Sequence, residues 1–125
     1  MPFVTDTHPL VWHMRDDPRL SFEAKRIFNE HYIFIPCIVL FELVYLIEKK
    51  RIAADLDGFL NSISSSKNYR IEPMCLPIIE KSRRIPRERV TDPWDRLIAA
   101  TSMHLNFPLI SRDESLREIG LEVIW

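Results

Sequence analysis

Short apolar segments alternate with stretches of helical periodicity along the whole chain. Five segments rich in apolar or β-branched residues are predicted to be strands, at residues 3–6, 32–35, 69–71, 109–111 and 122–125. Helical spacing and capping signals predict helices around residues 10–12, after residue 21, and over 36–50, 53–64, 77–85, 92–106 and 114–119. Strands that alternate with helices in this way form a parallel sheet with helices on both faces. The sequence therefore predicts an α/β fold.

The composition excludes several classes of protein. With 125 residues, we expect a single domain over residues 1–125. The 17 basic and 18 acidic residues nearly cancel, so only a local patch could hold a nucleic acid or an anionic membrane. Two cysteines without C-x-x-C spacing exclude a disulfide framework and a cysteine-rich zinc site. The two isolated glycines, Gly58 and Gly120, exclude a glycine-rich nucleotide-binding loop.

No segment predicts export or membrane insertion. The N-terminus lacks the basic start and the long apolar run of a signal peptide. The longest apolar stretch, residues 32–47, is interrupted by Pro36 and Glu42 and is shorter than the ~18 residues that suggest a spanning helix. We therefore expect a cytoplasmic protein without a membrane partner.

Two acidic residues follow predicted strands, Asp6 and Asp113. Ligands of open parallel sheets bind beyond the carboxyl ends of the strands, which makes both residues candidates for a site. Each could instead only cap the next helix. Because both acids directly follow predicted strands, a shared binding site is favoured, and helix capping remains the alternative for each.

Glu42 lies in residues 38–47, where every other residue is apolar. A helix that is apolar on all sides is a buried helix, which predicts that this carboxylate points inward. A buried carboxylate must be paired, protonated or bound to a metal ion. The alternative is a carboxylate at the helix edge that reaches solvent or a basic side chain.

Asp92 and Asp95 are three residues apart at the start of a predicted helix, so they share one face. With Pro93 between them, they form an acidic variant of a capping box, which is the purely structural alternative. Small residues follow in the same helix, including Ala99 and Ala100, and these allow the helix to lie close to the sheet. Such packing would bring Asp95 toward the strand ends.

Carboxylates that converge on one pocket repel one another. Each pair 4 Å apart costs on the order of 4 kcal/mol at an effective dielectric of about 20, so a cluster needs protons or a cation. Ligation by oxygen alone favours Mg²⁺ or Mn²⁺ over zinc. A hard cation of this kind suits phosphodiester hydrolysis.

These motifs resemble those of the PIN-domain ribonucleases over nearly the whole chain and in the same order. They are Asp6 after the first strand, Glu42 in an apolar helix, Asp-x-x-Ile-Ala-Ala-Thr from Asp95, and Ser111-Arg112-Asp113. The opening Thr5-Asp6-Thr7-His8-Pro9-Leu10-Val11-Trp12, the phrase Asp92-Pro93-Trp94-Asp95-Arg96-Leu97 and the ending Val123-Ile124-Trp125 look most like VapC-type toxins of type II toxin–antitoxin systems.

The resemblance implies a PIN-like three-layer α/β/α domain with a central parallel sheet of about five strands. It also implies a Mg²⁺- or Mn²⁺-dependent endoribonuclease toxin that hydrolyses phosphodiester bonds in RNA, with a cognate antitoxin over its active-site groove and a homodimeric state. The implied catalytic residues and metal ligands are Asp6, Glu42, Asp95 and Asp113, with Asp92 as a possible additional ligand.

An RNA substrate also requires positive charge. Residues 81–89 carry five basic residues and one acid immediately before Asp92, which makes this segment a candidate phosphate-binding rim. A solvated face is the alternative. The predicted RNA-binding residues are Arg83, Arg84, Arg87, Arg89, Arg96 and Arg112.

Two other functions remain open. A catalytically silent PIN fold could serve only as a binding module. A Mg²⁺-binding phospho-receiver domain has similar length and fold class, but it would need paired acids at the first strand end and a lysine at a late one. Here Asp6 stands alone, and the last strand has no lysine.

Overall fold

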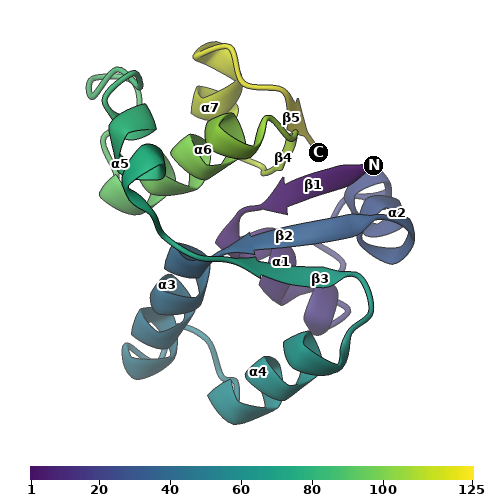
Figure 1. Cartoon of the computed structure of the whole chain (residues 1–125). Coiled ribbons are helices and arrows are strands. Elements are labelled where there is room, and N and C mark those ends of the chain that lie inside the picture. Colours follow the sequence, from purple (N-terminus) through teal and green to yellow (C-terminus); the bar gives the residue numbers. More distant parts are fainter.

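The computed structural model describes all residues, 1–125, and contains one five-stranded sheet in the order β3-β2-β1-β4-β5 (Figure 1). Every neighbouring pair of strands is parallel. The strands are β1 (Pro2–Thr5), β2 (Tyr32–Pro36), β3 (Tyr69–Glu72), β4 (Leu109–Ile110) and β5 (Val123–Ile124). The predicted α/β class and the expected parallel sheet of about five strands are therefore confirmed.

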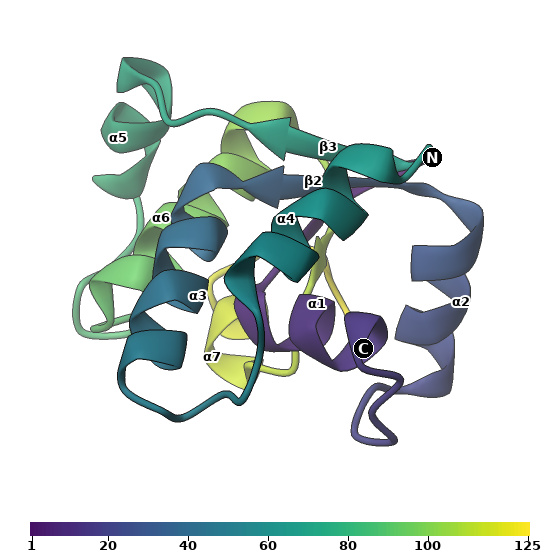
Figure 2. The ribbon, with the colours of Figure 1, turned by 90° about the horizontal axis from the view of Figure 1, so that it is seen from below.

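Seven helices connect and cover the strands. They are α1 (Thr7–Met14), α2 (Phe22–Glu30), α3 (Cys37–Glu48), α4 (Leu56–Ser65), α5 (Leu76–Ser82), α6 (Pro93–Leu105) and α7 (Glu114–Glu118). In Figure 1, α5, α6 and α7 gather on one side of the sheet, and α1, α3 and α4 on the other. Figure 2 shows the latter three helices in front of the strands. This arrangement is the three-layer α/β/α architecture.

Several predicted boundaries differ from the observed ones. Pro36 is the last residue of β2 and the N-cap of α3, so the helix begins one residue later than predicted. Helix α4 begins at Leu56 instead of residue 53, and α5 ends at Ser82 instead of residue 85. Asn106 closes α6 in the left-handed conformation, with φ 58°, at the position that glycine usually takes.

The order of the strands changes direction at β1. The two strands that follow it in sequence, β2 and β3, lie on one side, whereas β4 and β5 lie on the other. Thr5 at the end of β1 is paired with Ile110 at the end of β4, so the carboxyl ends of these two strands are adjacent. The crevice at such a switch point is the usual binding site of an open parallel sheet.

Helix α6 packs closely on the sheet. Ile98, Ala99 and Ala100 are completely buried, as are Val4 in β1 and Leu109 in β4. Small side chains let the helix backbone approach the strands, as the sequence predicted. This packing carries the start of α6 to the carboxyl edge of the sheet.

The prediction that α3 is buried on all sides is wrong. Its buried face consists of Val39, Leu43 and Leu46, whereas Phe41 is 57% exposed and Tyr45 is 43% exposed. The helix therefore covers the core with one face and presents aromatic side chains to solvent with another. No helix of the chain has both the length and the apolar character needed to cross a membrane.

Candidate active site

A cavity of about 660 Å³ opens at the carboxyl edge of the sheet, and five carboxylates line it. They come from the end of β1, from α3, from the start of α6 and from the turn after β4. They are the acids that the sequence singled out: Asp6, Glu42, Asp92, Asp95 and Asp113. We call this cavity the carboxylate pocket.

Both carboxylate oxygens of Asp6 accept hydrogen bonds. Oδ1 accepts a hydrogen bond from the backbone N–H of Thr7 at 2.8 Å, which caps α1. Oδ2 accepts a hydrogen bond from the Ser111 hydroxyl at 2.7 Å. Burial raises the pKa of Asp6, and these two hydrogen bonds oppose that effect. Asp6 is thus both a helix cap and a wall of the pocket, so the two interpretations of this residue are compatible.

Glu42 points toward the pocket from the second turn of α3. Its Oε1 accepts a hydrogen bond from the Thr7 hydroxyl at 2.6 Å. No basic side chain lies within 4.0 Å of it, so the alternative of a surface ion pair is not observed. Partial burial raises its pKa, and the nearby charge of Asp6 adds to the effect.

Asp92 and Asp95 differ in their hydrogen bonds although they share a helix turn. Asp92 Oδ1 accepts from the backbone N–H groups of Trp94 at 2.8 Å and Asp95 at 3.1 Å, and so caps α6. The Asp95 carboxylate accepts no hydrogen bond from the protein, so the reciprocal half of a capping box is not formed. Burial, reinforced by the charges of neighbouring acids, raises the pKa of Asp95 to about 7.

Asp113 is connected to Asp6 through hydrogen bonds of the Ser111 hydroxyl. Its Oδ1 accepts hydrogen bonds from the backbone N–H of Ser115 at 3.0 Å and from the Ser115 hydroxyl at 2.7 Å, which caps α7. The Asp113 N–H donates to the Ser111 hydroxyl at 3.1 Å. The buried Ser111 therefore links two of the pocket acids.

Thr7 and Ser111 are site residues that sequence analysis did not identify. Both are buried, and each donates its hydroxyl hydrogen bond to a pocket carboxylate. Their signal in the sequence is a hydroxyl residue within two positions of an acid that follows a strand.

The carboxylate pocket has an unbalanced negative charge. All six ion pairs of the chain lie elsewhere, and no Lys or Arg nitrogen comes within 4.0 Å of any of the five acids. The acids do not form a closed cage: no group of three or more His, Cys, Asp and Glu side chains lies as close together as the ligands of a bound ion. Mg²⁺ usually keeps several waters and takes only a few carboxylate ligands, so an open, oxygen-lined pocket fits it.

The predicted RNA-binding arginines occupy three different places. Arg112 lines the carboxylate pocket. Arg83, Arg84, Arg87 and Arg89 are exposed between α5 and α6, outside its lining. Arg96 is turned away from solvent, and its Nη2 donates to the carbonyl oxygens of Ser82 at 2.9 Å and Ile85 at 3.3 Å. Its guanidinium therefore connects α6 to the end of α5.

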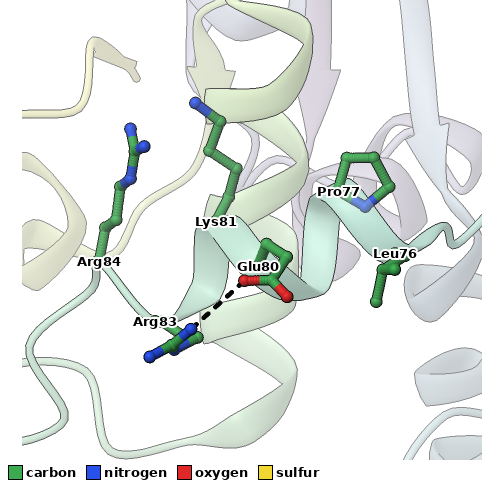
Figure 3. A pocket seen from close by; sticks show the side chains of 6 residues that line it. All are labelled: Leu76, Pro77, Glu80, Lys81, Arg83 and Arg84. Atoms are coloured by element: carbon green, nitrogen blue, oxygen red, sulfur yellow. Dashed lines mark hydrogen bonds and ion pairs between the residues drawn. The ribbon is translucent and has the colours of Figure 1, made fainter.

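A second hollow, of about 680 Å³, lies along α5. Figure 3 shows Lys81 and Arg84 extended in similar directions, and Arg83 paired with Glu80. The Arg83–Glu80 distance is 3.4 Å and both side chains are largely exposed, so this pair contributes little to stability. The hollow is a basic surface depression separate from the carboxylate pocket.

Comparisons with known proteins show sequence similarity over most of the chain. A family model described as PIN domain matches residues 3–121. Ribonuclease VapC22 of Mycobacterium tuberculosis (strain ATCC 25618 / H37Rv) is 26% identical over 113 residues, which cover 90% of this chain and 87% of that protein.

Two solved structures share the fold at low sequence identity. VapBC2 from Rickettsia felis, bound to a DNA fragment from its promoter, matches with a TM-score of 0.74 and 19% identity, covering 99% of this chain and 98% of that chain. A toxin–antitoxin complex from Klebsiella pneumoniae matches with a TM-score of 0.67 and 19% identity, covering 98% of this chain and 95% of that chain.

Proposed function

The chain belongs to the PIN domain family, and we propose that it is a Mg²⁺- or Mn²⁺-dependent endoribonuclease that hydrolyses phosphodiester bonds in RNA. One observation carries the proposal: five carboxylates line a single pocket, and no basic side chain lies within 4.0 Å to neutralise them. The similarity to a protein named Ribonuclease VapC22 supports nuclease chemistry.

Asp6, Glu42, Asp95 and Asp113 would hold the cation, with Asp92 as a possible further ligand. A bound divalent cation polarises a phosphoryl oxygen and lowers the pKa of water. Thr7 and Ser111 orient the oxygens of Glu42 and Asp6 through their hydroxyl hydrogen bonds. A pocket carboxylate accepts the proton of the attacking water, and cleavage leaves 5′-phosphate and 3′-hydroxyl ends.

Arginine side chains would bind the RNA backbone. Arg112 is the nearest candidate because it lines the carboxylate pocket itself. Arg83, Arg84, Arg87 and Arg89 would extend the contact along an exposed rim. Arg96 is better assigned to the α5–α6 interface, since its guanidinium is bonded to two backbone carbonyls.

We further propose that the chain is the toxin of a type II toxin–antitoxin pair and acts in the cytoplasm. The similarity to VapBC2 and to the Klebsiella toxin–antitoxin complex supports a cognate antitoxin as partner. Its proposed place is over the carboxylate pocket. A homodimer is the proposed state of the toxin.

The decisive experiment is cleavage of a mixed RNA pool by the purified protein. Cleavage should require Mg²⁺ or Mn²⁺, stop on addition of EDTA and produce 5′-phosphate ends. Asp95→Asn should abolish it, whereas Asp57→Asn, in an exposed acid of α4, should cleave as the unmodified protein does. A folded protein that binds RNA but never cleaves it would instead support the catalytically silent binding module.

A further inference from the structure

The basic residues between α5 and α6 lie on an ordered loop. Within residues 83–90, the side chains of Ile85 and Val90 are buried, so the loop is anchored to the core at two points. The Pro86 carbonyl accepts hydrogen bonds from the next two non-adjacent backbone N–H groups at 3.0 and 3.1 Å, which forms a turn. The loop begins directly after α5 (Figure 3) and carries Arg83, Arg84, Arg87 and Arg89. We call residues 83–90 the arginine loop.

One side chain of α6 holds the start of this loop. Nη2 of Arg96 donates to the carbonyl oxygens of Ser82 at 2.9 Å and Ile85 at 3.3 Å, so a residue of α6 caps the end of α5. The Ile85 carbonyl accepts no other hydrogen bond from the protein, and Ile85 is only 2% exposed. Buried carbonyls need a donor. Without Arg96, the loop would have to open toward solvent so that water could reach this carbonyl.

The guanidinium of Arg96 is incompletely paired. Its Nε is buried and has no hydrogen-bond partner. A buried N–H without a partner opposes folding, and a long apolar side chain at the same position would not bury such a group. We therefore expect Arg96 to matter more for the position of the arginine loop than for the stability of the whole domain.

The arginine loop ends beside the carboxylate pocket. Arg89 is three residues before Asp92, which lines the pocket and is the N-cap of α6. Three residues span at most about 10 Å, so the end of the loop lies close to the pocket. Arg84, Arg87 and Arg89 form no ion pair within 4.0 Å. Arginines fixed at this place can bind the phosphates that flank the cleaved one.

We infer that Arg96 is a positioning residue for RNA binding: it holds the arginine loop on α6 and so fixes the arginines of the loop relative to the carboxylate pocket. The inference rests on the proposed ribonuclease function and deepens it, because it assigns part of the affinity for RNA to a side chain that does not touch the RNA. A loop released from α6 keeps its charge. Its arginines must then be ordered when RNA binds, and the lost conformational freedom weakens binding.

Hydrogen–deuterium exchange measures release of the loop directly and without RNA. Arg96→Met, which keeps a long side chain of high helix propensity, should speed the exchange of the backbone amides in residues 85–90 about five- to tenfold, roughly the effect of losing one hydrogen bond. Unchanged exchange in Arg96→Met would overturn the inference, because the loop would then be held without Arg96.

Arg117→Met is the matched control. Nη2 of Arg117 also donates to a backbone carbonyl, that of Val123, at 3.2 Å, but this bond joins α7 to β5. Its loss should leave exchange in the arginine loop unchanged. Equal acceleration in the loop of both variants would show a general loosening of the fold and would overturn the specific role of Arg96.

Steady-state cleavage measures the consequence for RNA. Arg96→Met should raise KM about five- to tenfold and leave kcat nearly unchanged, since the carboxylates of the pocket stay in place. Arg117→Met should keep both constants. An unchanged KM in Arg96→Met would overturn the inference, because the position of the loop would then not affect the binding of RNA.

A double-mutant cycle separates positioning from direct contact with RNA. Its second variant replaces three arginines of the loop by glutamine: Arg84, Arg87 and Arg89. If Arg96 acts through these side chains, Arg96→Met should raise KM little in that background, because no arginine is left to position. An equal rise of KM in both backgrounds would show that Arg96 binds RNA itself and would overturn the inference.

Melting temperatures establish that each variant is folded. If Arg96→Met does not fold, Arg96→Gln takes its place with the same expected results, since the glutamine amide is two atoms closer to the backbone and cannot reach both carbonyls. Absence of cleavage by the intact protein would contradict the ribonuclease function itself. Metal-dependent cleavage with an unchanged KM in the Arg96 variant would contradict only the role of Arg96.

Discussion

The Thr7 hydroxyl donates a 2.6 Å hydrogen bond to Glu42 Oε1, which joins the first turn of α1 to a residue 35 positions further along the chain. The backbone N–H of Thr7 donates to Asp6 Oδ1 at 2.8 Å. One buried residue therefore orients two carboxylates of the pocket. Thr7 is a positioning residue, because it acts through the two carboxylates to which it donates hydrogen bonds.

Thr7→Val should weaken Mn²⁺ binding by roughly 10- to 100-fold, which is typical when a residue that orients a metal ligand is lost. Valine has nearly the shape of threonine but cannot donate a hydrogen bond to Glu42. Isothermal titration calorimetry measures the effect, and Thr7→Ser, which keeps the hydroxyl, should bind Mn²⁺ nearly as the unmodified protein does. Equal affinities for Thr7→Val and the unmodified protein would show that the Glu42 orientation does not depend on this bond.

Glu42→Gln should reduce the rise in melting temperature that millimolar Mg²⁺ or Mn²⁺ produces. A ligand that binds only the folded state stabilises it, and the amide is a weaker ligand for a hard cation than the carboxylate. Glu48→Gln is the matched control, because Glu48 is exposed at the end of the same helix. A full metal-dependent rise in Glu42→Gln would mean that Glu42 is not a ligand.

Asp92→Asn and Asp95→Asn should differ in cleavage although both remain folded. Asparagine caps a helix about as well as aspartate, so the hydrogen bonds from Trp94 and Asp95 to residue 92 should persist. The carboxylate of Asp95 accepts no hydrogen bond from a backbone N–H group, and we expect its negative charge to bind the cation. RNA cleavage should be nearly lost in Asp95→Asn and only reduced in Asp92→Asn. Equal loss in both variants would place Asp92 among the ligands.

Without divalent cations, Asp95→Asn should be more stable than the unmodified protein at pH 8. The pKa of Asp95 is raised to about 7 in the folded state and is about 4 in an unfolded chain. The folded state thus retains this proton where the unfolded state has released it, so the contribution of Asp95 to the free energy of unfolding falls as pH rises from about 4 to about 7.

The comparison requires thermal unfolding in EDTA at several pH values. The stabilisation by Asp95→Asn should be fully developed at pH 8 and should shrink as the pH is lowered toward 4. Loss of a first-turn charge opposes it by only about 0.3–1 kcal/mol. Lower stability of Asp95→Asn at pH 8 would contradict the repulsive environment described for this residue.

Local features of the fold were largely predictable. Helix capping by Asp6, Asp92 and Asp113 was the structural alternative that the sequence offered, and each of them does accept a hydrogen bond from a backbone N–H group. These features depend on contacts within a few residues of the chain, so the residue type and its neighbours specify them.

The exposure of α3 was not predictable from its composition. An apolar sequence indicates that a helix prefers burial, but the neighbouring elements decide which of its faces is covered. Here Val39 and Leu43 are buried while Phe41 and Tyr45 remain exposed.

The alternation of apolar and helical segments by itself determines that this chain forms a parallel sheet covered by helices. The sequence also shows that acidic residues follow two of the strands. The sequence does not determine which strand ends are neighbours. Pairing of β1 with β4 brings Ser111 to Asp6 across 105 positions and gathers the other acids around them. The resulting burial and repulsion raise the pKa of Asp95 to about 7. Only tertiary structure decides these properties, because Coulomb energies and desolvation depend on distance in space and not on separation along the chain.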